Sequence, residues 1–533
     1  MINQLTAEQQ LQIDSIFAQW NQPGSPGCAL AITLDDEIVY ERGYGYAQLE
    51  YDIPITPETI FHVASVSKQF TAMAIALLAA EGLVDLDANV RQYVPELYEF
   101  DYPVTVRQLV HHTSGLRDQW ELLMVAGWRL DDVITKEHLM KMIMRQRELN
   151  FVPGSEYLYS NTGYTLMAEI VERVAGQTLR QFAAERIFQP LGMHDTHFHD
   201  DHEEIVKNRA YSYAPRLAGG WHKSVLSYAN VGATSLFTTV RDLSQWLANF
   251  SHARVGGNEV IEQMHQRYVL NNGETIPYGF GLMFAEYKGW QEIGHSGADA
   301  GFRSWCGRIE PHGLGIVVLS NCSTAVPREL ARRVADVMLA DKEVKVVEAA
   351  EPHAQLCPAD CAGAYLVQYL GQQLLITVKD GGLYAQLEEA DVPELLQPLD
   401  ESSYKATVSG AKITFNRDEA GQVNGCTWQQ QGINMAGKKM PDYQLSAREL
   451  AEYVGRYYSP ELDTTYRLEV RDDELVVSFQ RHPDVVLVPW GTDHFVRQRT
   501  PATEFKFMRE AGEIVGFRLS GGRIRNVWFR RTL

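Results

Sequence analysis

Basic side chains are scarce in this chain of 533 residues compared with acidic ones. The sequence holds 48 Lys and Arg against 68 Asp and Glu, which gives a formal net charge of −20. Binding to a phosphate backbone requires a basic surface, so this balance argues against nucleic acid as a partner. It also disfavours binding to anionic membrane surfaces.

Cysteine and long apolar runs are scarce as well. Six scattered cysteines in a chain of this length favour reduced thiols over a disulfide framework. The longest apolar run, at residues 72–80, is too short to span a bilayer. The N-terminus lacks a basic stretch followed by an apolar core, so it does not resemble a secretory signal. We therefore expect a cytoplasmic protein.

The overall composition, with 45% hydrophobic and 22% charged residues, is that of a soluble globular protein, and the length predicts about two to four domains. Strand patterns occur near both ends of the first 340 residues, at 27–34, 37–44, 290–294, 302–309 and 314–319. Helical patterns fill the interval and flank it, at 6–20, 65–81, 104–110, 131–148, 164–175, 179–188, 242–250 and 327–339. This order predicts one mainly antiparallel sheet flanked by helices, with a helical subdomain.

The remaining chain, beyond a charged linker at 342–354, changes to short strands and turns. It contains a repeat, because 363–365 resembles 455–457 and 419–425 resembles 510–516. This spacing is too long for a solenoid unit and predicts two copies of one small antiparallel barrel or sandwich. The predicted domains are therefore 1–342, 355–440 and 446–533.

The most informative pair of residues is Ser65 and Lys68, which precede an apolar, alanine-rich segment at 71–81. This segment predicts a buried helix that ends at Gly82. Ser65 then falls at the helix N-terminus, and Lys68, three residues further, shares its face. A hydroxyl and an amine would meet where backbone N–H groups are unpaired. That arrangement suits a serine nucleophile that gives its proton to a neutral lysine and builds an oxyanion.

Two other Ser-x-x-Lys pairs show that the spacing alone is weak. Ser402 with Lys405 and Ser409 with Lys412 lie in polar, strand-like sequence with no helix behind them. For Ser65 taken alone, a helix N-cap is the structural alternative.

Tyr159 and His295 are two further candidates for chemistry. A tyrosine beside the lysine can pass the proton to the leaving group as a general acid. A histidine on the opposite wall can hold the substrate and polarise the tyrosine oxygen. Taken singly, Tyr159 could equally be a buried aromatic residue and His295 an ordinary histidine at a strand end.

Three motifs occur together in a fixed order: Ser-x-x-Lys at 65–68, Tyr-Ser-Asn at 159–161 and His-Ser-Gly at 295–297. This set resembles the serine β-lactamase, penicillin-binding protein and esterase superfamily, in the class C-like branch with Tyr-x-Asn as second motif. The resemblance covers residues 8–340 and extends to the stretches 112–116, 190–193 and 278–282. It implies a β-lactamase-like α/β domain followed by the two all-β barrel-like domains.

The resemblance also implies a role for each matching residue. Ser65 would be the acylated nucleophile, and Lys68 and Tyr159 would share the general base and acid roles. Asn161 would hydrogen-bond the acyl group of the substrate. The backbone N–H groups of Ser65 and Ala298 would form the oxyanion hole.

The third motif departs from class C β-lactamases, which carry Lys-Thr-Gly where this chain has His295, Ser296 and Gly297. Lysine there favours a substrate carboxylate, whereas histidine is mostly neutral at pH 7. Histidine in this place, with Gly297 lining the substrate site, resembles D-aminopeptidases and some esterases, and so does a catalytic part followed by two barrels. In the D-aminopeptidases a loop of the last barrel supplies an acidic residue for the substrate amine. Asp484 and Asp493 lie in the corresponding region, with a solvated loop charge as the alternative for each.

Two groups of residues suggest metal ligands. The stretch 194–202 carries four histidines, but a polar surface loop is the favoured interpretation. His353, Cys357 and Cys361 are spaced by four residues and lack a fourth ligand. We expect neither a metal ion nor a cofactor.

These observations predict a metal-independent serine hydrolase that works through an acyl-enzyme on a small amide or ester, most like a D-aminopeptidase. A carboxylesterase or weak β-lactamase of the same fold is the alternative, and a binding protein that lost turnover stays open. The expected partner is a small-molecule or short-peptide substrate. A homodimer is also open, because the barrels could either gate the site or join two copies.

Overall fold

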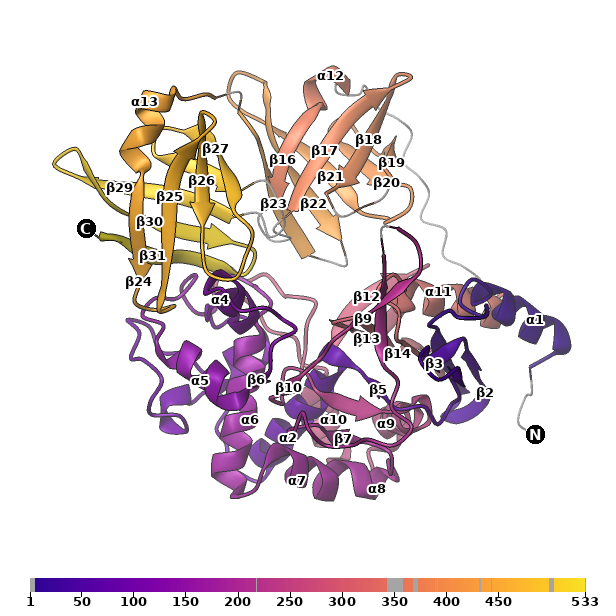
Figure 1. Cartoon of the computed structure of the whole chain (residues 1–533). Helices are drawn as coiled ribbons and strands as arrows, with labels where there is room; N and C mark the ends of the chain where they lie inside the picture. The colour runs from indigo at the N-terminus through magenta and orange to yellow at the C-terminus, as the bar shows by residue number, and fades with distance from the viewer. Residues whose placement is uncertain are drawn as a thin grey trace. The chain divides into compact units, whose positions relative to one another are not determined.

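The computed structural model describes residues 5–532 apart from 217, 343–357, 368–371, 389, 391, 431–432, 442 and 498–502. The chain forms two compact units (Figure 1). The first comprises Met1–Leu116, Leu130–Met144 and Phe151–Val346, and the second comprises Arg117–Arg129, Arg145–Asn150 and Val347–Leu533. Most of the predicted linker lies outside the described residues, so the domain bounds given above stay a prediction.

The first unit is built on a six-stranded antiparallel sheet with the order β12-β13-β14-β15-β1-β2. Asp35 and Asp36 join β1 to β2 with positive φ angles of 48° and 69°, as a two-residue hairpin requires. The first strand pairs with the last, so strands from both ends of this region meet in one sheet, which confirms the expected arrangement. The strands are β1 (Cys28–Leu34), β2 (Glu37–Tyr44), β12 (Met283–Tyr287), β13 (Trp290–Asp299), β14 (Phe302–Glu310) and β15 (Leu314–Ser320).

Helices cover both faces of this sheet. On one face, α1 (Ala7–Ile16) and α11 (Pro327–Met338) contact each other and share a core cluster with the strands. On the other face lies α9 (Val240–His252), close enough that a Cβ at Gly315 would come within 3.0 Å of Leu247. Because both faces are covered, every residue of β15 is buried.

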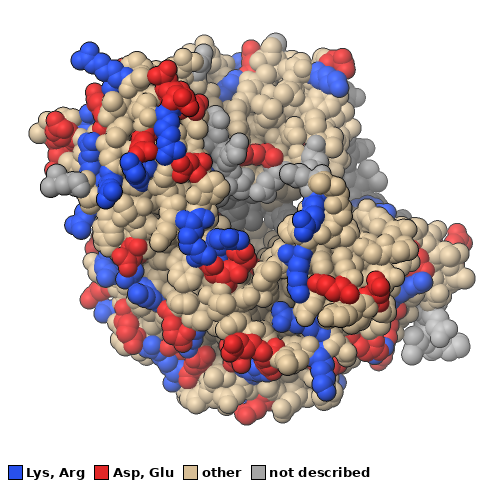
Figure 2. All heavy atoms as spheres, viewed as in Figure 1, with Lys and Arg blue, Asp and Glu red and all other residues tan. Residues whose placement is uncertain are grey.

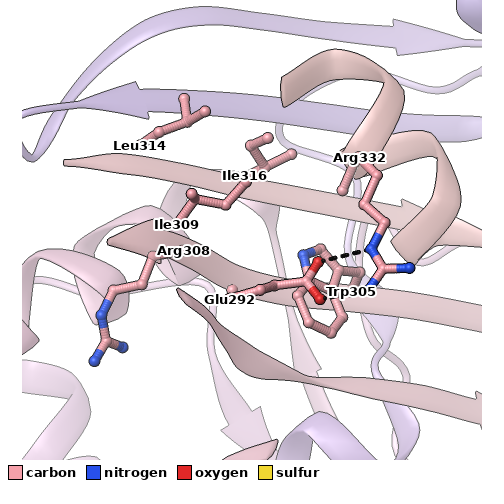
Figure 3. A pocket seen from close by; sticks show the side chains of 9 residues that line it. Glu292, Trp305, Arg308, Ile309, Leu314, Ile316 and Arg332 are labelled. Atoms are coloured by element: carbon pink, nitrogen blue, oxygen red, sulfur yellow. Dashed lines mark hydrogen bonds and ion pairs between the residues drawn. The ribbon is translucent and has the colours of Figure 1, made fainter. Parts of the chain in front are cut away.

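A buried carboxylate ties α11 to the sheet. Glu292 on β13 accepts hydrogen bonds from Arg328 and Arg332 of α11, at 2.9 Å from each guanidinium, with Trp305 beside it (Figure 3). Glu292, Trp305 and Arg332 line a cavity of about 10 Å³, which has room for one water molecule at most. The cluster is therefore structural rather than a substrate site.

The helix at the centre of the first unit is α2 (Ser67–Ala80). Every residue from 67 to 78 is buried, as expected for a helix that is apolar on all sides. Gly82, with φ of 71°, follows it, as predicted. The other helices are α3 (Val106–Val110), α5 (Lys136–Met144), α6 (Asn161–Ala175), α7 (Leu179–Ala183), α8 (Gln189–Leu191) and α10 (Gly257–Met264), with the 3-10 turns η1 (Ala64–Val66) and η2 (Val90–Gln92) and the short π-helix η3 (Ala184–Phe188).

Short strands surround this helical part. Three of them form a sheet with the order β5-β11-β7, made of β5 (Phe61–His62), β11 (Leu236–Thr238) and β7 (His197–Phe198). Since β5 ends three residues before Ser65, this sheet fixes the path of the chain into the candidate nucleophile. Three two-stranded sheets are made of β3 (Tyr46–Gln48) with β4 (Ile53–Pro54), β6 (Ile134–Thr135) with β10 (Tyr228–Ala229), and β8 (Ser212–Pro215) with β9 (Trp221–Ser224).

The second unit contains two closed eight-stranded barrels, which confirms the barrel alternative for the repeat. The first has β16 (Gly363–Val367), β17 (Gln372–Lys379), β18 (Gly382–Leu387), β19 (Glu394–Pro398), β20 (Ser403–Ala406), β21 (Lys412–Arg417), β22 (Val423–Gln430) and β23 (Ile433–Lys439). The second has β24 (Gly455–Ser459), β25 (Thr464–Arg471), β26 (Glu474–Ser478), β27 (Val485–Gly491), β28 (His494–Arg497), β29 (Thr503–Glu510), β30 (Glu513–Gly521) and β31 (Ile524–Thr532).

The two barrels repeat individual contacts as well as topology. Tyr365 donates its hydroxyl to the carbonyl of Cys361 at 2.7 Å, and Tyr457 donates to the carbonyl of Tyr453 at 2.9 Å. A short helical segment precedes each barrel, α12 (Pro358–Cys361) in one case and α13 (Ala447–Leu450) with η4 (Ala451–Tyr453) in the other. The matching bonds in equivalent places support descent of both barrels from one unit.

The second unit also includes α4 (Gln119–Val125) from the early part of the chain. Arg117, only 1% exposed, donates to Glu461 at 2.6 Å, and Tyr466 donates its hydroxyl to the carbonyl of Val125 at 2.7 Å. Sequence patterns gave no sign of this grouping, because the segment carries no repeat or turn signal of its own.

Acidic and basic side chains are interspersed on the face shown in Figure 2. Within the described part of the chain, Cys28, Cys306, Cys322 and Cys426 are free and buried, which agrees with the expectation of reduced thiols for these four residues. The described helices include none with the length and apolar character that a membrane crossing requires.

Candidate active site

Ser65 lies in the 3-10 turn η1 directly before α2, rather than in the first turn of the α-helix itself. The turn is held on several sides. Ala64 has a φ of 48°, an unusual value for a residue with a side chain, and its carbonyl accepts the Ser67 hydroxyl at 2.5 Å. A Cβ at Gly297 would lie 2.3 Å from the carbonyl oxygen of Val63, so only glycine lets β13 approach this closely. Strain of this kind persists where surrounding contacts fix it, which is typical of functional sites.

Lys68 places its amine beside the Ser65 hydroxyl, at 3.0 Å between Nζ and Oγ. The lysine is fully buried, and its Nζ also lies 2.8 Å from Oδ1 of Asn161 and 2.7 Å from the carbonyl oxygen of Ala233. Gly281 packs closely against the backbone of this lysine, since a Cβ at Gly281 would lie 2.7 Å from the Lys68 backbone. A buried amine with these partners has a fixed direction towards the serine.

Tyr159 and Asn161 enter the site from the start of α6. The Tyr159 ring centroid lies 4.9 Å from Nζ of Lys68, and Asn161, the first residue of α6, faces the same amine. The structure therefore brings the second motif to the Ser65–Lys68 pair.

His295 lies on β13, and its ring centroid is 6.1 Å from that of Tyr159. Its Nδ1 lies 2.6 Å from the carbonyl oxygen of Ser296, so Nδ1 carries the proton and donates it there. Its Nε2 then accepts the hydroxyl of Tyr278 at 3.0 Å. The sequence suggested a donor to substrate or to the Tyr159 oxygen, but in this structure the single N–H of a neutral His295 is already used.

Burial, with a smaller effect from the nearby Lys68 amine, lowers the pKa of His295 from 6.5 to about 3. The unfolded chain binds a proton at this residue below about pH 6.5, while the native protein does not until about pH 3. His295 therefore leaves the free energy of unfolding unchanged above about pH 6.5, and it lowers this free energy progressively as the pH falls from 6.5 towards 3.

We predict that His295→Gln flattens the acid limb of the stability curve, by up to about 1.4 kcal/mol per pH unit between pH 6.5 and 3. The measurement is the free energy of unfolding in urea across that range. His194→Gln, at an exposed position, is the control and should keep the wild-type slope. Equal slopes in all three proteins would contradict a neutral, buried His295.

Gly297 and Ala298 continue β13 beyond His295. Ala298 is exposed and pairs with Arg303, and β13 contacts the η1 turn that carries Ser65. This places Ala298 directly after the His-Ser-Gly motif, on the strand that borders the nucleophile. The role of Gly297 in packing against Val63 is a finding that the sequence motif alone did not reveal.

Three groups near the site were not named as site residues from the sequence: the Ala233 carbonyl, Tyr278 and His112. His112 is 1% exposed, with its ring 4.2 Å from that of Tyr159 and 4.7 Å from that of Tyr278. His112 and Tyr278 belong to the stretches 112–116 and 278–282, which were noted only as supporting matches. The carbonyl of Ala233 has no side-chain signal that could have marked it.

The acidic candidates Asp484 and Asp493 belong to the second unit. Asp484 pairs with Arg471 at 2.5 Å, and Asp493 accepts from Arg509 at 2.9 Å, so each aspartate has a basic partner in its own barrel. His353 and Cys357 lie outside the described residues.

The histidine run at 194–202 is not the polar surface loop that was favoured. His197 and Phe198 form β7, and His199 is only 3% exposed. Side chains alternate along a strand, so Phe198 points into the core while His197 and His199 point to the opposite side. The many polar residues in this stretch hid the strand pattern in the sequence.

Comparison with known proteins identifies the first unit. The sequence model of the Beta-lactamase family matches residues 12–339. The D-aminopeptidase of Gluconobacter oxydans is 26% identical over 442 residues, covering 83% of this chain and 81% of that protein. The D-aminopeptidase of Cereibacter sphaeroides is 26% identical over 520 residues, covering 95% of this chain and 96% of that protein.

Solved structures agree on the fold. An octameric penicillin-binding protein homologue from Pyrococcus abyssi superposes with a TM-score of 0.57 at 23% identity, covering 90% of this chain and 99% of that one. The D-amino acid amidase from Ochrobactrum anthropi gives 0.54 at 25% identity, covering 63% of this chain and 100% of that one. The first match extends well beyond the region of the family model.

Proposed function

The chain belongs to the Beta-lactamase family, and from that premise we propose that it is a serine hydrolase that cleaves amide bonds of small D-amino acid derivatives or short peptides through an acyl-enzyme. The observation that carries the proposal is the 3.0 Å contact between Nζ of Lys68 and Oγ of Ser65 inside a buried cluster. An amine and a hydroxyl in this arrangement form an activated nucleophile.

Lys68 is the general base in this proposal. A neutral amine has two N–H donors and one lone pair. The carbonyl oxygens of Asn161 and Ala233, at 2.8 and 2.7 Å, match the two donors, which directs the lone pair at the Ser65 hydroxyl. The serine proton then passes to Nζ as Oγ attacks the carbonyl carbon of the substrate.

Tyr159 passes this proton to the leaving amine. Its ring lies beside Nζ of Lys68, so a proton taken by the lysine can reach the phenol and from there the leaving group. The backbone N–H groups of Ser65 and Ala298 stabilise the oxyanion, and Asn161 holds the acyl group. Water then attacks the acyl carbon, and the same groups carry a proton from this water to Oγ of Ser65. The acyl group leaves as the free acid and the serine hydroxyl is restored.

His295 acts as a positioning residue rather than as a donor to substrate. Its contacts with Tyr278 and with the Ser296 carbonyl hold it neutral against the Tyr159 ring. A neutral group here lacks the charge that would favour a substrate carboxylate. This supports a substrate without that carboxylate over a penicillin, the substrate of the weak β-lactamase alternative.

The preference for D-amino acid amides follows from the relatives rather than from the geometry. Relatives that align with 80% or more of this chain carry the name D-aminopeptidase, and a structural neighbour is a D-amino acid amidase. The carboxylesterase alternative uses the same nucleophile and differs only in the leaving group.

Rates on matched substrates test the preference. We predict that kcat/KM for D-alanine p-nitroanilide exceeds that for L-alanine p-nitroanilide by at least about tenfold, a difference of about 1.4 kcal/mol in transition-state binding. p-Nitrophenyl acetate serves as the ester control. Turnover of the ester without either anilide would support the carboxylesterase, and an L preference would contradict the proposed substrate class.

A further inference from the structure

A group of ionisable side chains outside the candidate active site gathers around β7. His197 and His199 are two residues apart on this strand and face the same side. Glu204 joins them from the turn that follows, where its N–H bonds the carbonyl of Asp201 at 3.2 Å. One ligand atom from each of the three side chains lies within 4.8 Å of the other two.

Packing alone does not explain this group. His199 is 3% exposed, yet its Nδ1 has no hydrogen-bond partner among the described residues, and neither does the buried Nε2 of His197. An unpaired buried nitrogen costs about 1–3 kcal/mol, so two of them in one place call for an explanation such as a missing ligand. Oε2 of Glu204 lies 3.7 Å from Nδ1 of His199, which is beyond hydrogen-bond range.

We propose that His197, His199 and Glu204 form a binding site for a divalent transition-metal ion of the zinc type. Two imidazole nitrogens and one carboxylate oxygen are ligands that Zn²⁺ accepts, with water as a fourth. Around zinc such atoms lie about 3.3 Å apart, so atoms within 4.8 Å need to move by about 1 Å, within the reach of side-chain rotation.

The surroundings fit this function. Arg180 holds Glu204 through two hydrogen bonds, at 2.6 and 2.8 Å, and also donates to Asp200 at 2.9 Å. Carboxylate ligands in metal sites are commonly oriented by such outer hydrogen bonds. Phe237 lies under the group, with its ring 4.5 Å from that of His199, and limits access of water from that side.

The site adjoins the strands that lead to the nucleophile without touching it. His197 pairs with Phe237 on β11, and Phe237 pairs with His62 on β5, three residues before Ser65. A metal ion would pin β7 to the turn at 201–204 and stiffen this small sheet. The inference stands independently of the proposed hydrolase reaction, because none of its ligands belongs to that machinery.

Zinc binding to the untagged full-length protein tests the proposal. After treatment with a chelator, we expect titration with Zn²⁺ to reach one bound ion per chain and to raise Tm by several degrees, because a ligand that binds only the native state stabilises it. Cobalt in place of zinc should give the visible absorption of a four-coordinate site.

His199→Ala and Glu204→Gln should each abolish the stoichiometric binding and the Tm shift. Glu204→Gln keeps the shape of the side chain and guards against a folding failure in the histidine variant. His194→Ala removes an exposed histidine of the same run and should bind zinc like the wild type. Absence of saturable binding in the wild type, or unchanged binding in both ligand variants, would overturn the proposal.

Discussion

Ser65→Ala is expected to lower kcat/KM for D-alanine p-nitroanilide by about 10⁵-fold or more. Removal of the nucleophile eliminates the acyl-enzyme path, and loss of such a serine in another hydrolase costs about 10⁶ in kcat. The remaining rate would come from the oxyanion donors and from substrate binding. The substitution removes one partly buried hydroxyl, so the fold should persist, and the far-UV circular dichroism spectrum should match that of the wild type.

Ser409→Ala is the matched control for this experiment. Ser409 starts another Ser-x-x-Lys pair, but it lies in an exposed turn of the first barrel, where its hydroxyl donates to Glu394 at 2.7 Å. This variant should keep the wild-type rate. A Ser65 variant with more than a few per cent of wild-type activity would contradict the assignment of the nucleophile.

Lys68→Met is the second substitution with a very large expected effect, a loss of about 10³–10⁵-fold in kcat/KM. Methionine fills a similar volume and removes the amine that takes the proton of Ser65. General base catalysis alone contributes about 10²–10⁴-fold to the rate. Where the base acts as a unit with its nucleophile, removing the base can lower the rate as much as removing the nucleophile does.

The stability of this variant separates a chemical role from a structural one. Loss of the amine leaves the carbonyl oxygens of Asn161 and Ala233 without this donor, at a cost of about 1–3 kcal/mol each, while the cost of burying the amine itself is removed. We therefore expect Tm to fall by several degrees at most, so that the protein stays folded under assay conditions while activity is lost. A large fall in Tm with activity loss in proportion to the unfolded fraction would mean that Lys68 mainly holds the fold.

Much of this arrangement could be predicted from local sequence. Alternation around Asp35 and Asp36 gave the first hairpin, and the alanine-rich run gave the buried helix after Ser65. These features depend on the periodicity of neighbouring residues, which a single sequence displays directly. The ordered motifs then indicated which side chains far apart in the chain would meet.

Features that depend on distant backbone groups could not be predicted in this way. The Ala233 carbonyl that accepts from Lys68 lies 165 residues away and has no distinguishing side chain. The hydrogen bond from Nδ1 of His295 to the carbonyl of Ser296, its neighbour on the same strand, depends on the rotation of the imidazole ring, which no sequence motif reveals. Burial of His199 was missed because the polar residues around it concealed a two-residue strand, and Arg117 joins the second unit through a partner more than 300 residues away.

Identification of the acylated residue by mass spectrometry tests the central claim most directly. Incubation with a fluorophosphonate, followed by proteolysis, should yield one modified peptide, with the added mass on Ser65. The Ser409→Ala protein should give the same adduct, and the Ser65→Ala protein none. An unmodified wild-type protein, or a label on a different serine, would contradict a hydrolase built on the hydroxyl that Lys68 contacts.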